Sequence, residues 1–390
     1  MFTLNLAQQK QAQNIVNLTL GEGYIDIQKI KSSGYQKYQV FIIKRHHQVL
    51  GIAWVKFLSR EDLIKKTRNK LSYSNLTAHI DVVAIHPKFQ KKGIGNQLFK
   101  QIIKQNNLEF ISIDELRKIL IENKNYENKK ILITVDDAYR SFYENGWKVL
   151  KEKKIPFILF FNTREVNANN PNYMTWDQIR EIHNSKIGVI GGHSFSHEYL
   201  INKSESEIKE DLEKSHKDYL RELNFRPKYF SYPFGEYSSA FKKIVKEFNY
   251  ELAFGQHSGV IDKSKDLFEL PRYPVNESYG KAERFLTLLN TKPFPFKAFK
   301  PENKFINKSD NPPKIEIEFF KEMTNLEKIN CFANDGGEWS KKKITFIEKN
   351  WIRINLDKKF KERTGRINCS LLDNDKQFRW LGFQFVIDGN

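Results

Sequence analysis

Residues 129–163, KKILITVDDAYRSFYENGWKVLKEKKIPFILFFNT, indicate the fold class of the central part of the chain. The run ILITV predicts a buried strand, and the residues from Ser141 onward predict a helix that ends before Pro156. The run FILFF (157–161) then predicts the next strand. A strand, a helix and a second strand in such close succession are typical of a parallel β-α unit.

The same alternation of short apolar strands and amphipathic helices extends over residues 108–290, so we expect an α/β architecture there. Asp136 and Asp137 directly follow the strand ILITV, at the sheet edge where parallel α/β folds place their functional sites. Because neighbouring side chains alternate in direction along a strand, the two carboxylates can take different roles. Taken alone, such a pair ahead of a helix is more often a solvated helix cap.

A histidine pair follows a second predicted strand. The segment KIGVIGGHSFSHEYL (186–200) ends an apolar run with two glycines and then His193 and His197, four residues apart. Two histidines at this spacing can converge on one ion if the segment coils. Joined to the upstream aspartates, they form an Asp-His-His set with open coordination positions, the design of a catalytic rather than a structural metal site.

Three further strand ends carry polar or turn-forming residues. Pro233-Phe234-Gly235 forms a sharp turn after a strand, His257 lies in a glycine-flanked turn, and Arg272 follows one more strand. Because the carboxyl ends of parallel strands meet at one edge of a sheet, these five successive strand ends predict a single pocket.

Three motifs of this region resemble, in the right order, those of the NodB-type polysaccharide deacetylases, a family of carbohydrate esterases. The motifs are Thr134-Val135-Asp136-Asp137-Ala138, His193-Ser194-Phe195-Ser196-His197 and Ser231-Tyr232-Pro233-Phe234-Gly235. The resemblance covers about residues 108–290 and implies a distorted (β/α) barrel that removes N-acetyl groups. It implies Asp136 as the general base, Asp137, His193 and His197 as ligands of a divalent metal such as Zn²⁺, and the backbone N–H of Phe234 as an oxyanion donor.

The chain departs from the family pattern at three positions. Ala138 replaces the usual glycine, which restricts φ at that turn. Ser231 stands where many members carry an arginine that orients the base. Leu270-Pro271-Arg272 replaces the usual Leu-x-His, whose histidine acts as the general acid. We therefore predict His257 as the missing acid, with a surface turn histidine as the alternative.

Residues 1–107 resemble the GNAT acetyltransferases. The stretch AHIDVVAIHPKFQKKGIGNQLFKQIIKQ (78–105) predicts a strand, a turn containing Gln90, Gly93 and Gly95, and a helix, and such a turn suits a pyrophosphate. The preceding VFIIKRHHQVLGIAWVKFL (40–58) is similar to the family's central hairpin. A complete GNAT domain needs further strands, so we expect a truncated region. It either binds acetyl-CoA or is a remnant used for packing, substrate presentation or dimerisation.

The last quarter of the chain changes to a period of two. Residues 291–313 are rich in proline, so we expect a linker or an extended strap without regular elements. Residues 314–390 then predict six short strands in a small antiparallel β-sandwich. Cys331 and Cys369 fall inside two of these strands and are expected to be buried free thiols. Trp339, Trp351 and Trp380 are core residues or, as the alternative, sugar-stacking aromatics.

Composition narrows the classes of function for this chain of 390 residues. The 65 basic and 47 acidic residues give a net charge of +18, but the lysines are spread along the chain beside acidic or amide residues. That pattern indicates a solvated surface rather than a nucleic-acid interface. No apolar run reaches about 18 residues and no secretory signal is evident, so we expect no membrane span and a cytoplasmic protein.

Together these patterns predict a metal-dependent hydrolase that removes N-acetyl groups from an amino-sugar glycan or a glycan precursor in surface-polysaccharide synthesis. Two alternatives stay open. The departures at Ala138, Ser231 and Arg272 would also fit a glycan-binding protein that has lost turnover. The N-terminal region would also fit an acetyl-CoA-dependent acyltransferase.

Overall fold

The computed structural model describes residues 38–45, 48–58, 77–85, 108–122, 129–275, 282–374 and 377–389. The chain divides into two compact units, and each is described by itself. The first unit contains Met1–Leu108, Val275–Thr291 and Asn374–Phe378, and the second contains Glu109–Pro274, Lys292–Asp373 and Arg379–Asn390.

The first unit holds a three-stranded antiparallel sheet in the order β1-β2-β3. Its strands are β1 (Tyr38–Arg45), β2 (Gln48–Leu58) and β3 (Thr77–Ile85). The hairpin predicted within residues 40–58 and the strand predicted after residue 77 are therefore confirmed. Helix α11 (Ala282–Leu289), which is distant in sequence, contacts β3 in the same unit. Gln90, Gly93 and Gly95 lie outside the described residues, so their predicted role in cofactor binding stays a prediction.

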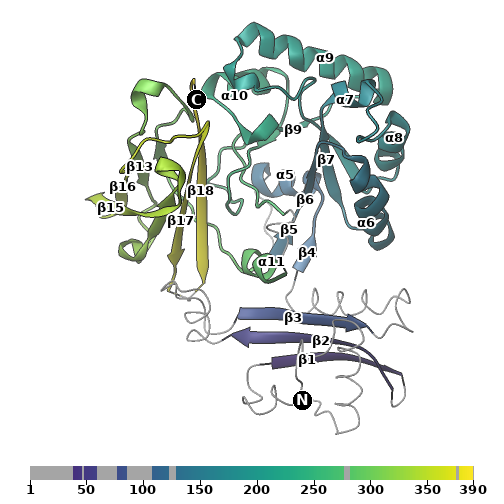
Figure 1. The fold of residues 1–390 in the computed structure, drawn as a ribbon, viewed down its shortest axis with the longest axis horizontal. Helices are drawn as coiled ribbons and strands as arrows, with labels where there is room; N and C mark the ends of the chain where they lie inside the picture. The colour runs from purple at the N-terminus through teal and green to yellow at the C-terminus, as the bar shows by residue number, and fades with distance from the viewer. Residues whose placement is uncertain are drawn as a thin grey trace. The chain divides into compact units, whose positions relative to one another are not determined.

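The second unit contains the predicted parallel sheet, in the order β10-β9-β8-β7-β6. The strands are β6 (Ile133–Asp136), β7 (Phe157–Phe161), β8 (Gly188–Gly192), β9 (Tyr229–Ser231) and β10 (Leu252–Phe254). All neighbouring pairs in this sheet run parallel. The described strands form a curved half-barrel, where a distorted barrel was predicted (Figure 1). A small pair, β4 (Leu108–Phe110) and β5 (Lys129–Ile131), lies beside it in the chain.

Strand β7 shows why FILFF is an uninterrupted apolar run. All five of its residues are buried. Phe157, Leu159 and Phe161 pack in a cluster with side chains of α8 (Trp176–Asn184), whereas Ile158 and Phe160 pack in another cluster with side chains of α5 (Ile113–Ile121). A strand covered on both faces needs apolar residues at every position, as is typical of parallel sheets.

The remaining helices of this layer are α6 (Lys148–Lys153), α7 (Thr163–Asn167), α9 (Glu205–Leu223) and α10 (Ser239–Glu247). Local sequence fixes where they begin. Helix α8 begins with a capping box formed by Thr175 and Gln178, and α9 begins with one formed by Ser204 and Glu207. Each box satisfies free backbone N–H groups of the first helical turn. The helix predicted from Ser141 is confirmed as a wide turn over Phe142–Trp147 that continues into α6.

The C-terminal part of the second unit is an eight-stranded, largely antiparallel sheet in the order β11-β13-β16-β15-β14-β17-β18-β12. The six predicted strands are confirmed as β13 (Ile315–Glu318), β14 (Asn330–Ala333), β15 (Ser340–Glu348), β16 (Trp351–Asn355), β17 (Thr364–Leu372) and β18 (Phe378–Ile387). Strand β15 pairs with β14 through Ser340–Lys342 and with β16 through its later residues. Side chains from both halves of the sheet share one hydrophobic core.

We predicted that residues 291–313 contain no regular elements, and this prediction is wrong. This stretch contributes β11 (Ala298–Lys300) and β12 (Phe305–Ile306), the two outermost strands of the sheet. Its prolines lie outside these short strands, and Pro301 directly follows β11. Edge strands tolerate adjacent prolines because one side of the strand needs no hydrogen-bond donors.

The prediction that Cys331 and Cys369 are free thiols is also wrong. Cys331 of β14 and Cys369 of β17 are direct partners in the strand register and form a disulfide. Both side chains are fully buried in the core of the sheet. The sequence shows that each cysteine lies in a strand, but the pairing depends on which strands are neighbours and on their register.

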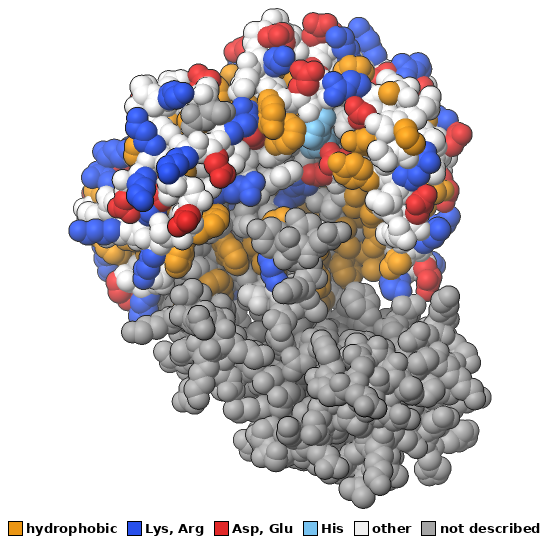
Figure 2. Space-filling view, viewed as in Figure 1, with side chains coloured by type: hydrophobic (Ala, Val, Ile, Leu, Met, Phe, Trp, Pro, Cys, Tyr) orange, Lys and Arg blue, Asp and Glu red, His pale blue; other side chains and the backbone are white. Residues whose placement is uncertain are grey.

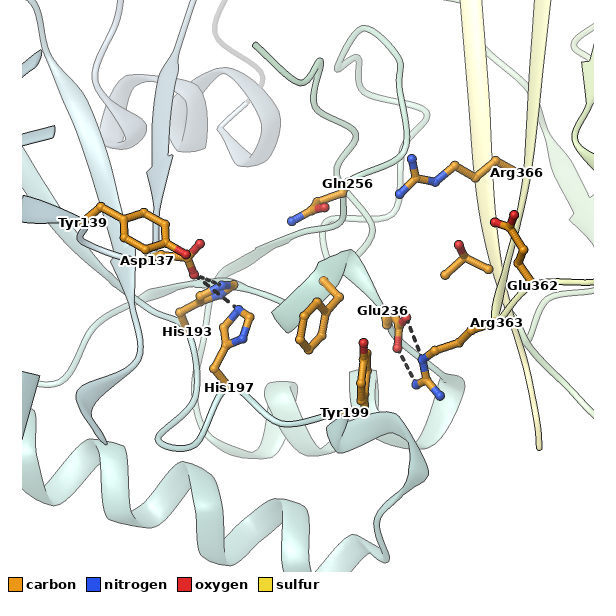
Figure 3. Close-up of a pocket in the computed structure, with 12 residues that line it drawn as sticks. Asp137, Tyr139, His193, His197, Tyr199, Glu236, Gln256, Glu362, Arg363 and Arg366 are labelled. Atoms are coloured by element: carbon orange, nitrogen blue, oxygen red, sulfur yellow. Dashed lines mark hydrogen bonds and ion pairs between the residues drawn. The ribbon is translucent and has the colours of Figure 1, made fainter. Parts of the chain in front are cut away.

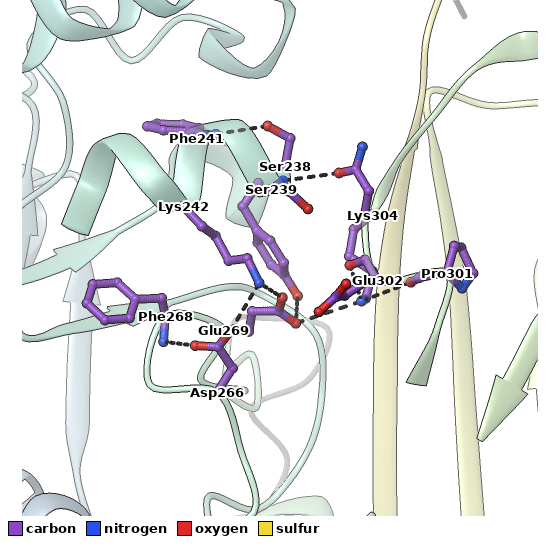
Figure 4. A network of polar contacts seen from close by, with 12 residues as sticks. Ser238, Ser239, Phe241, Lys242, Asp266, Phe268, Glu269, Pro301, Glu302 and Lys304 are labelled. Atoms are coloured by element: carbon purple, nitrogen blue, oxygen red, sulfur yellow. Dashed lines mark hydrogen bonds and ion pairs between the residues drawn. The ribbon is translucent and has the colours of Figure 1, made fainter. Parts of the chain in front are cut away.

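Polar contacts join the parallel sheet to the C-terminal sheet within the second unit (Figure 4). Lys242 of α10 forms ion pairs with Asp266 and Glu269. The buried ammonium of Lys304, just before β12, lies 3.8 Å from a carboxylate oxygen of Glu269. The backbone N–H of Ser239 donates to the side chain of Asn303 at 3.1 Å. These contacts hold the C-terminal sheet against the loops of the parallel sheet.

The surface of the described residues mixes charges of both signs. Figure 2 shows lysine and arginine side chains interspersed with aspartate and glutamate on the visible face. Among the helices of the described residues, none combines the length and the apolar character that crossing a membrane requires.

Candidate metal centre and active site

The structure brings together the three residues predicted as metal ligands. Asp137 follows β6, and His193 and His197 follow β8. The Nε2 atoms of His193 and His197 lie 3.5 Å and 3.3 Å from the same oxygen, Oδ1 of Asp137 (Figure 3). All three ligand atoms lie within 4.8 Å of one another. Two imidazole nitrogens and one carboxylate oxygen form a donor set that suits Zn²⁺ and leaves a coordination position open.

A hydrogen bond orients His193 for this role. Its Nδ1–H donates to the carbonyl oxygen of Ser231 at 2.6 Å, which leaves Nε2 directed at Asp137. Metal-binding histidines commonly have their second ring nitrogen fixed in this way. Burial would lower the pKa of His193, but its hydrogen bond to Asp137 and the charges of Asp136 and Asp137 outweigh burial and raise it. Binding of a metal at Nε2 therefore competes with protonation of this nitrogen.

Left-handed backbone at both turns places these ligands. Asp137 and Ala138 have φ values of 73° and 54°, and His197 has a φ of 53°. Few non-glycine residues adopt this region without a compensating contact. Ala138 is fully buried, and its carbonyl accepts a hydrogen bond from the N–H of Met174 at 2.9 Å. Ala138 therefore adopts a backbone conformation that favours glycine, at the turn where we predicted that its side chain restricts φ.

Asp211 of α9 holds the loop between the two histidines. Its carboxylate accepts hydrogen bonds from the backbone N–H groups of Phe195 and Ser196, at 2.8 Å and 3.1 Å. The hydroxyl of Ser194 also accepts one from the N–H of His197 at 2.9 Å. Burial dominates at the pKa of Asp211 and raises it, although the loop N–H groups oppose the shift. A side chain of α9 therefore fixes the loop between the two histidines, a contact that was not predicted from the sequence.

Asp136 is held by Arg272, which the sequence placed at the predicted pocket without a chemical role. The guanidinium donates from Nη1 and Nη2 to the two carboxylate oxygens, both at 2.8 Å. It also donates to the hydroxyls of Ser231 and Thr134, at 2.9 Å and 3.1 Å. Burial alone would raise the pKa of Asp136, but the charge and hydrogen bonds of Arg272 outweigh it and lower the pKa. Asp136 is therefore kept ionised.

Arg272 thus explains two of the departures at once. The arginine expected at position 231 is replaced by a serine, and Arg272, two residues after an isolated bridge between Leu270 and Phe254 of β10, reaches the same aspartate. It lies where the pattern expected a histidine. The exchange could have been suspected from Ser231 and Arg272 together, but only the fold brings these positions side by side.

His257 is not brought to the metal centre. Its side chain is buried beside Tyr237, with ring centroids 6.1 Å apart, and it does not line the cavity described below. Burial, with the positive charges of Lys304 and Lys265, lowers the pKa of His257 to about 3. The predicted alternative of a surface turn histidine does not describe this buried ring.

A cavity of about 460 Å³ opens at Asp137 and the two histidines. Phe234, predicted for the oxyanion site, lines it with a left-handed φ of 59°. In the space-filling view a histidine surface is visible between hydrophobic side chains (Figure 2). The other lining residues were not singled out from the sequence: Tyr139, Tyr199, Glu236, Gln256, Glu362, Arg363, Thr364 and Arg366. The last four come from the C-terminal sheet and its preceding loop, far from the motifs in sequence.

Comparisons with known proteins match two parts of the chain. Residues 123–253 match the sequence model of the polysaccharide deacetylase family, and residues 12–112 match that of the GNAT acetyltransferase family. The poly-beta-1,6-N-acetyl-D-glucosamine N-deacetylase of Staphylococcus aureus (strain MSSA476) is 22% identical over 188 residues. That match covers 45% of this chain and spans 64% of the length of the relative.

Two solved structures are also similar. The deacetylase PplD of Streptococcus pyogenes, in complex with acetate, has a TM-score of 0.45 and 21% identity, covering 48% of this chain and 83% of that one. IcaB of Ammonifex degensii has a TM-score of 0.45 and 22% identity, covering 51% and 88%. The family match includes the Asp136-Asp137 turn, the His193–His197 loop and the Phe234 turn. Residues 123–253 are therefore similar to the polysaccharide deacetylase family, the family that the three motifs resemble.

Proposed function

We propose that this protein is a metal-dependent hydrolase that removes N-acetyl groups from an amino-sugar glycan, with an N-acetylglucosamine polymer as the preferred class of substrate. The observation that carries the proposal is the meeting of Asp137, His193 and His197 at the mouth of a cavity, next to the ionised Asp136. The similarity to the poly-beta-1,6-N-acetyl-D-glucosamine N-deacetylase of Staphylococcus aureus supports the choice of glycan.

Each residue of the site has a separate role in the hydrolysis. Asp137, His193 and His197 hold a divalent metal, by expectation Zn²⁺, which supplies Lewis-acid chemistry toward the amide carbonyl and the attacking water when bound. Asp136 accepts a proton from the water that attacks the N-acetyl carbon. Arg272 keeps Asp136 ionised and fixes the direction of its carboxylate.

The backbone N–H of Phe234 donates to the oxygen that becomes negative as the water adds. The C–N bond then breaks, the nitrogen takes up a proton, and acetate and a free amino sugar result. His257 stays a prediction as the proton donor. An imidazole with a pKa of about 3 carries no proton near pH 7, and this one is buried apart from the cavity.

The test is acetate release from β-1,6-linked N-acetylglucosamine oligomers in the presence of Zn²⁺ or Co²⁺. Asp136→Asn keeps the size of the side chain but cannot accept the proton, so we expect the rate to fall by roughly 10²- to 10⁴-fold. Asp218→Asn changes a buried carboxylate that bonds Thr163 and Asn167 outside the cavity, and it serves as the matched control. Equal rates for wild type and Asp136→Asn would refute the assignment of the base.

A further inference from the structure

The C-terminal sheet forms one wall of the cavity that contains the metal ligands. Glu362 and Arg363 directly precede β17, and Thr364 and Arg366 lie at its start. Figure 3 shows Glu362, Arg363 and Arg366 across the cavity from the three metal ligands. The family match ends at residue 253, so this wall lies outside the segment that carries the chemistry.

Arg363 fixes the wall to the active-site loops. Its guanidinium donates to both carboxylate oxygens of Glu236, from Nε at 3.1 Å and from Nη2 at 2.7 Å. It also lies over the ring of Tyr199, 4.0 Å from the centroid. Tyr199 stacks on Phe234, whose ring meets that of His197 edge-on at 4.5 Å. This continuous series of contacts sets the distance from the wall to a metal ligand.

Arg366 differs from Arg363 because its guanidinium lines the cavity without being held by another of the described side chains. Its backbone N–H donates to the side-chain oxygen of Asn334 at 2.6 Å, and its carbonyl accepts from the N–H of Asn334 at 3.2 Å. The guanidinium is exposed and makes no hydrogen bond or ion pair with the residues that the structure describes, although its charge acts on Glu236. It extends toward Gln256 on the opposite side (Figure 3).

The chemistry of the lining suits a neutral ligand rich in hydroxyl groups. Arg366 offers planar donors, Glu362 offers acceptors, and Thr364 and Gln256 offer both. Tyr199 is 46% exposed, and because Phe234 and Arg363 cover the two faces of its ring, its edge and hydroxyl are what a sugar can meet. Because guanidinium and carboxylate groups lie on the same wall, the surface is not built for anions alone.

The cavity is also larger than the reacting group requires. At the ~30 Å³ that a water molecule occupies in the liquid, the four heavy atoms of an acetamido group take on the order of 100 Å³. Most of the 460 Å³ is therefore left for the sugar ring and for what is attached to it.

We propose that residues 362–366 form a sugar subsite, in which Arg366 and Thr364 hydrogen-bond to a sugar residue linked to the one that loses its acetyl group. This inference rests on the proposed function and deepens it, because it names the residues that bind a second sugar of the polymer. Arg363 and Glu236 position the subsite, whereas Arg366 binds the ligand.

The test compares Arg366→Ala with wild type on N-acetylglucosamine itself and on its β-1,6-linked oligomers from dimer to hexamer. Loss of a charged hydrogen bond to the neighbouring sugar should raise KM for the oligomers roughly tenfold with kcat retained, and it should leave KM for the single sugar unchanged. Lys341→Ala removes an exposed cation of the same sheet outside the cavity and should leave the length dependence as in wild type. An equal change at every chain length, or no change at any, would overturn the subsite.

A binding measurement separates failure of the subsite from failure of the proposed function. Calorimetry with the hexamer uses Asp136→Asn, which slows turnover, with and without Arg366→Ala. Binding that weakens about tenfold with Arg366→Ala supports the subsite even if wild type releases no acetate, in which case the hydrolase assignment alone fails. Equal binding by the two variants, or no binding by either, overturns the subsite.

Discussion

Replacing Arg272 by glutamine should both destabilise the protein and impair its chemistry. The change removes two hydrogen bonds of 2.8 Å to Asp136 and those to Ser231, Thr134 and the carbonyl of Gly255. The side chains of Arg272 and Asp136 are 12% and 19% exposed, so solvent screens the pair little. Leaving one charge of such a pair without its partner costs about 3–5 kcal/mol in the free energy of unfolding.

The loss should depend on pH in a defined direction. With Arg272 present, the pKa of Asp136 lies below its usual value, so the pair stabilises the fold above the pKa of the unfolded state and loses this effect as pH falls through the folded pKa. Without Arg272, burial is opposed far less and Asp136 takes up a proton at a higher pH. The difference between wild type and Arg272→Gln should therefore be largest near neutral pH and shrink toward pH 4.

The assay is urea unfolding at pH 7.5 and pH 4.5 in EDTA, so that bound metal does not contribute. Arg272→Lys keeps the charge but loses the two-pronged contact, and it should fall between wild type and Arg272→Gln. Ser231→Ala removes one hydroxyl partner of the same guanidinium and should cost about 1 kcal/mol. A loss below about 1 kcal/mol for Arg272→Gln, or the same loss at both pH values, would show that Arg272 does not stabilise the ionised form of Asp136.

Three further predictions concern the disulfide, a buried histidine and the metal. Thiol titration in urea without reductant should find no free thiol, and reduction should cost about 4 kcal/mol for two cysteines 38 residues apart; two titratable thiols would contradict the pairing. Burial lowers the pKa of His216 to about 4. The unfolded state then binds the proton first, so the free energy of unfolding should fall by about 3 kcal/mol between pH 7 and pH 4. His216→Gln should reduce that slope in urea unfolding, and an unchanged slope would rule out His216 as its source. Zn²⁺ at a hundredfold excess over its Kd should stabilise wild type by about 2.7 kcal/mol in thermal unfolding. His197→Ala should lose most of this gain, whereas an equal gain would place the metal elsewhere.

Local sequence was sufficient where a pattern and its physical cause lie in the same segment. The apolar run at β7 reports a strand covered on both faces, and it predicted the parallel sheet. Since strand ends of such a sheet share an edge, Asp137, His193 and His197 could be placed together before the fold was known.

The features that sequence missed all depend on contacts between distant segments. Arg272 reaches Asp136 across 136 positions, and Arg363 reaches Glu236 across 127. The cysteine pair depends on strand register, which the alternating pattern of β14 and β17 leaves undetermined. The proline-rich stretch 291–313 contains two edge strands because β11 pairs with β13 and β12 pairs with β18, two strands outside this stretch.

Above all, we propose that Asp137, His193 and His197 hold the metal that hydrolysis needs. The most direct measurement strips the protein of metal, adds Zn²⁺ stepwise, and records bound metal and acetate release from the N-acetylglucosamine hexamer in the same samples. We predict that acetate release rises in proportion to the first equivalent of bound metal, and that His197→Ala loses both the metal and the activity. Full acetate release by the stripped protein, or by His197→Ala without bound metal, would contradict the claim.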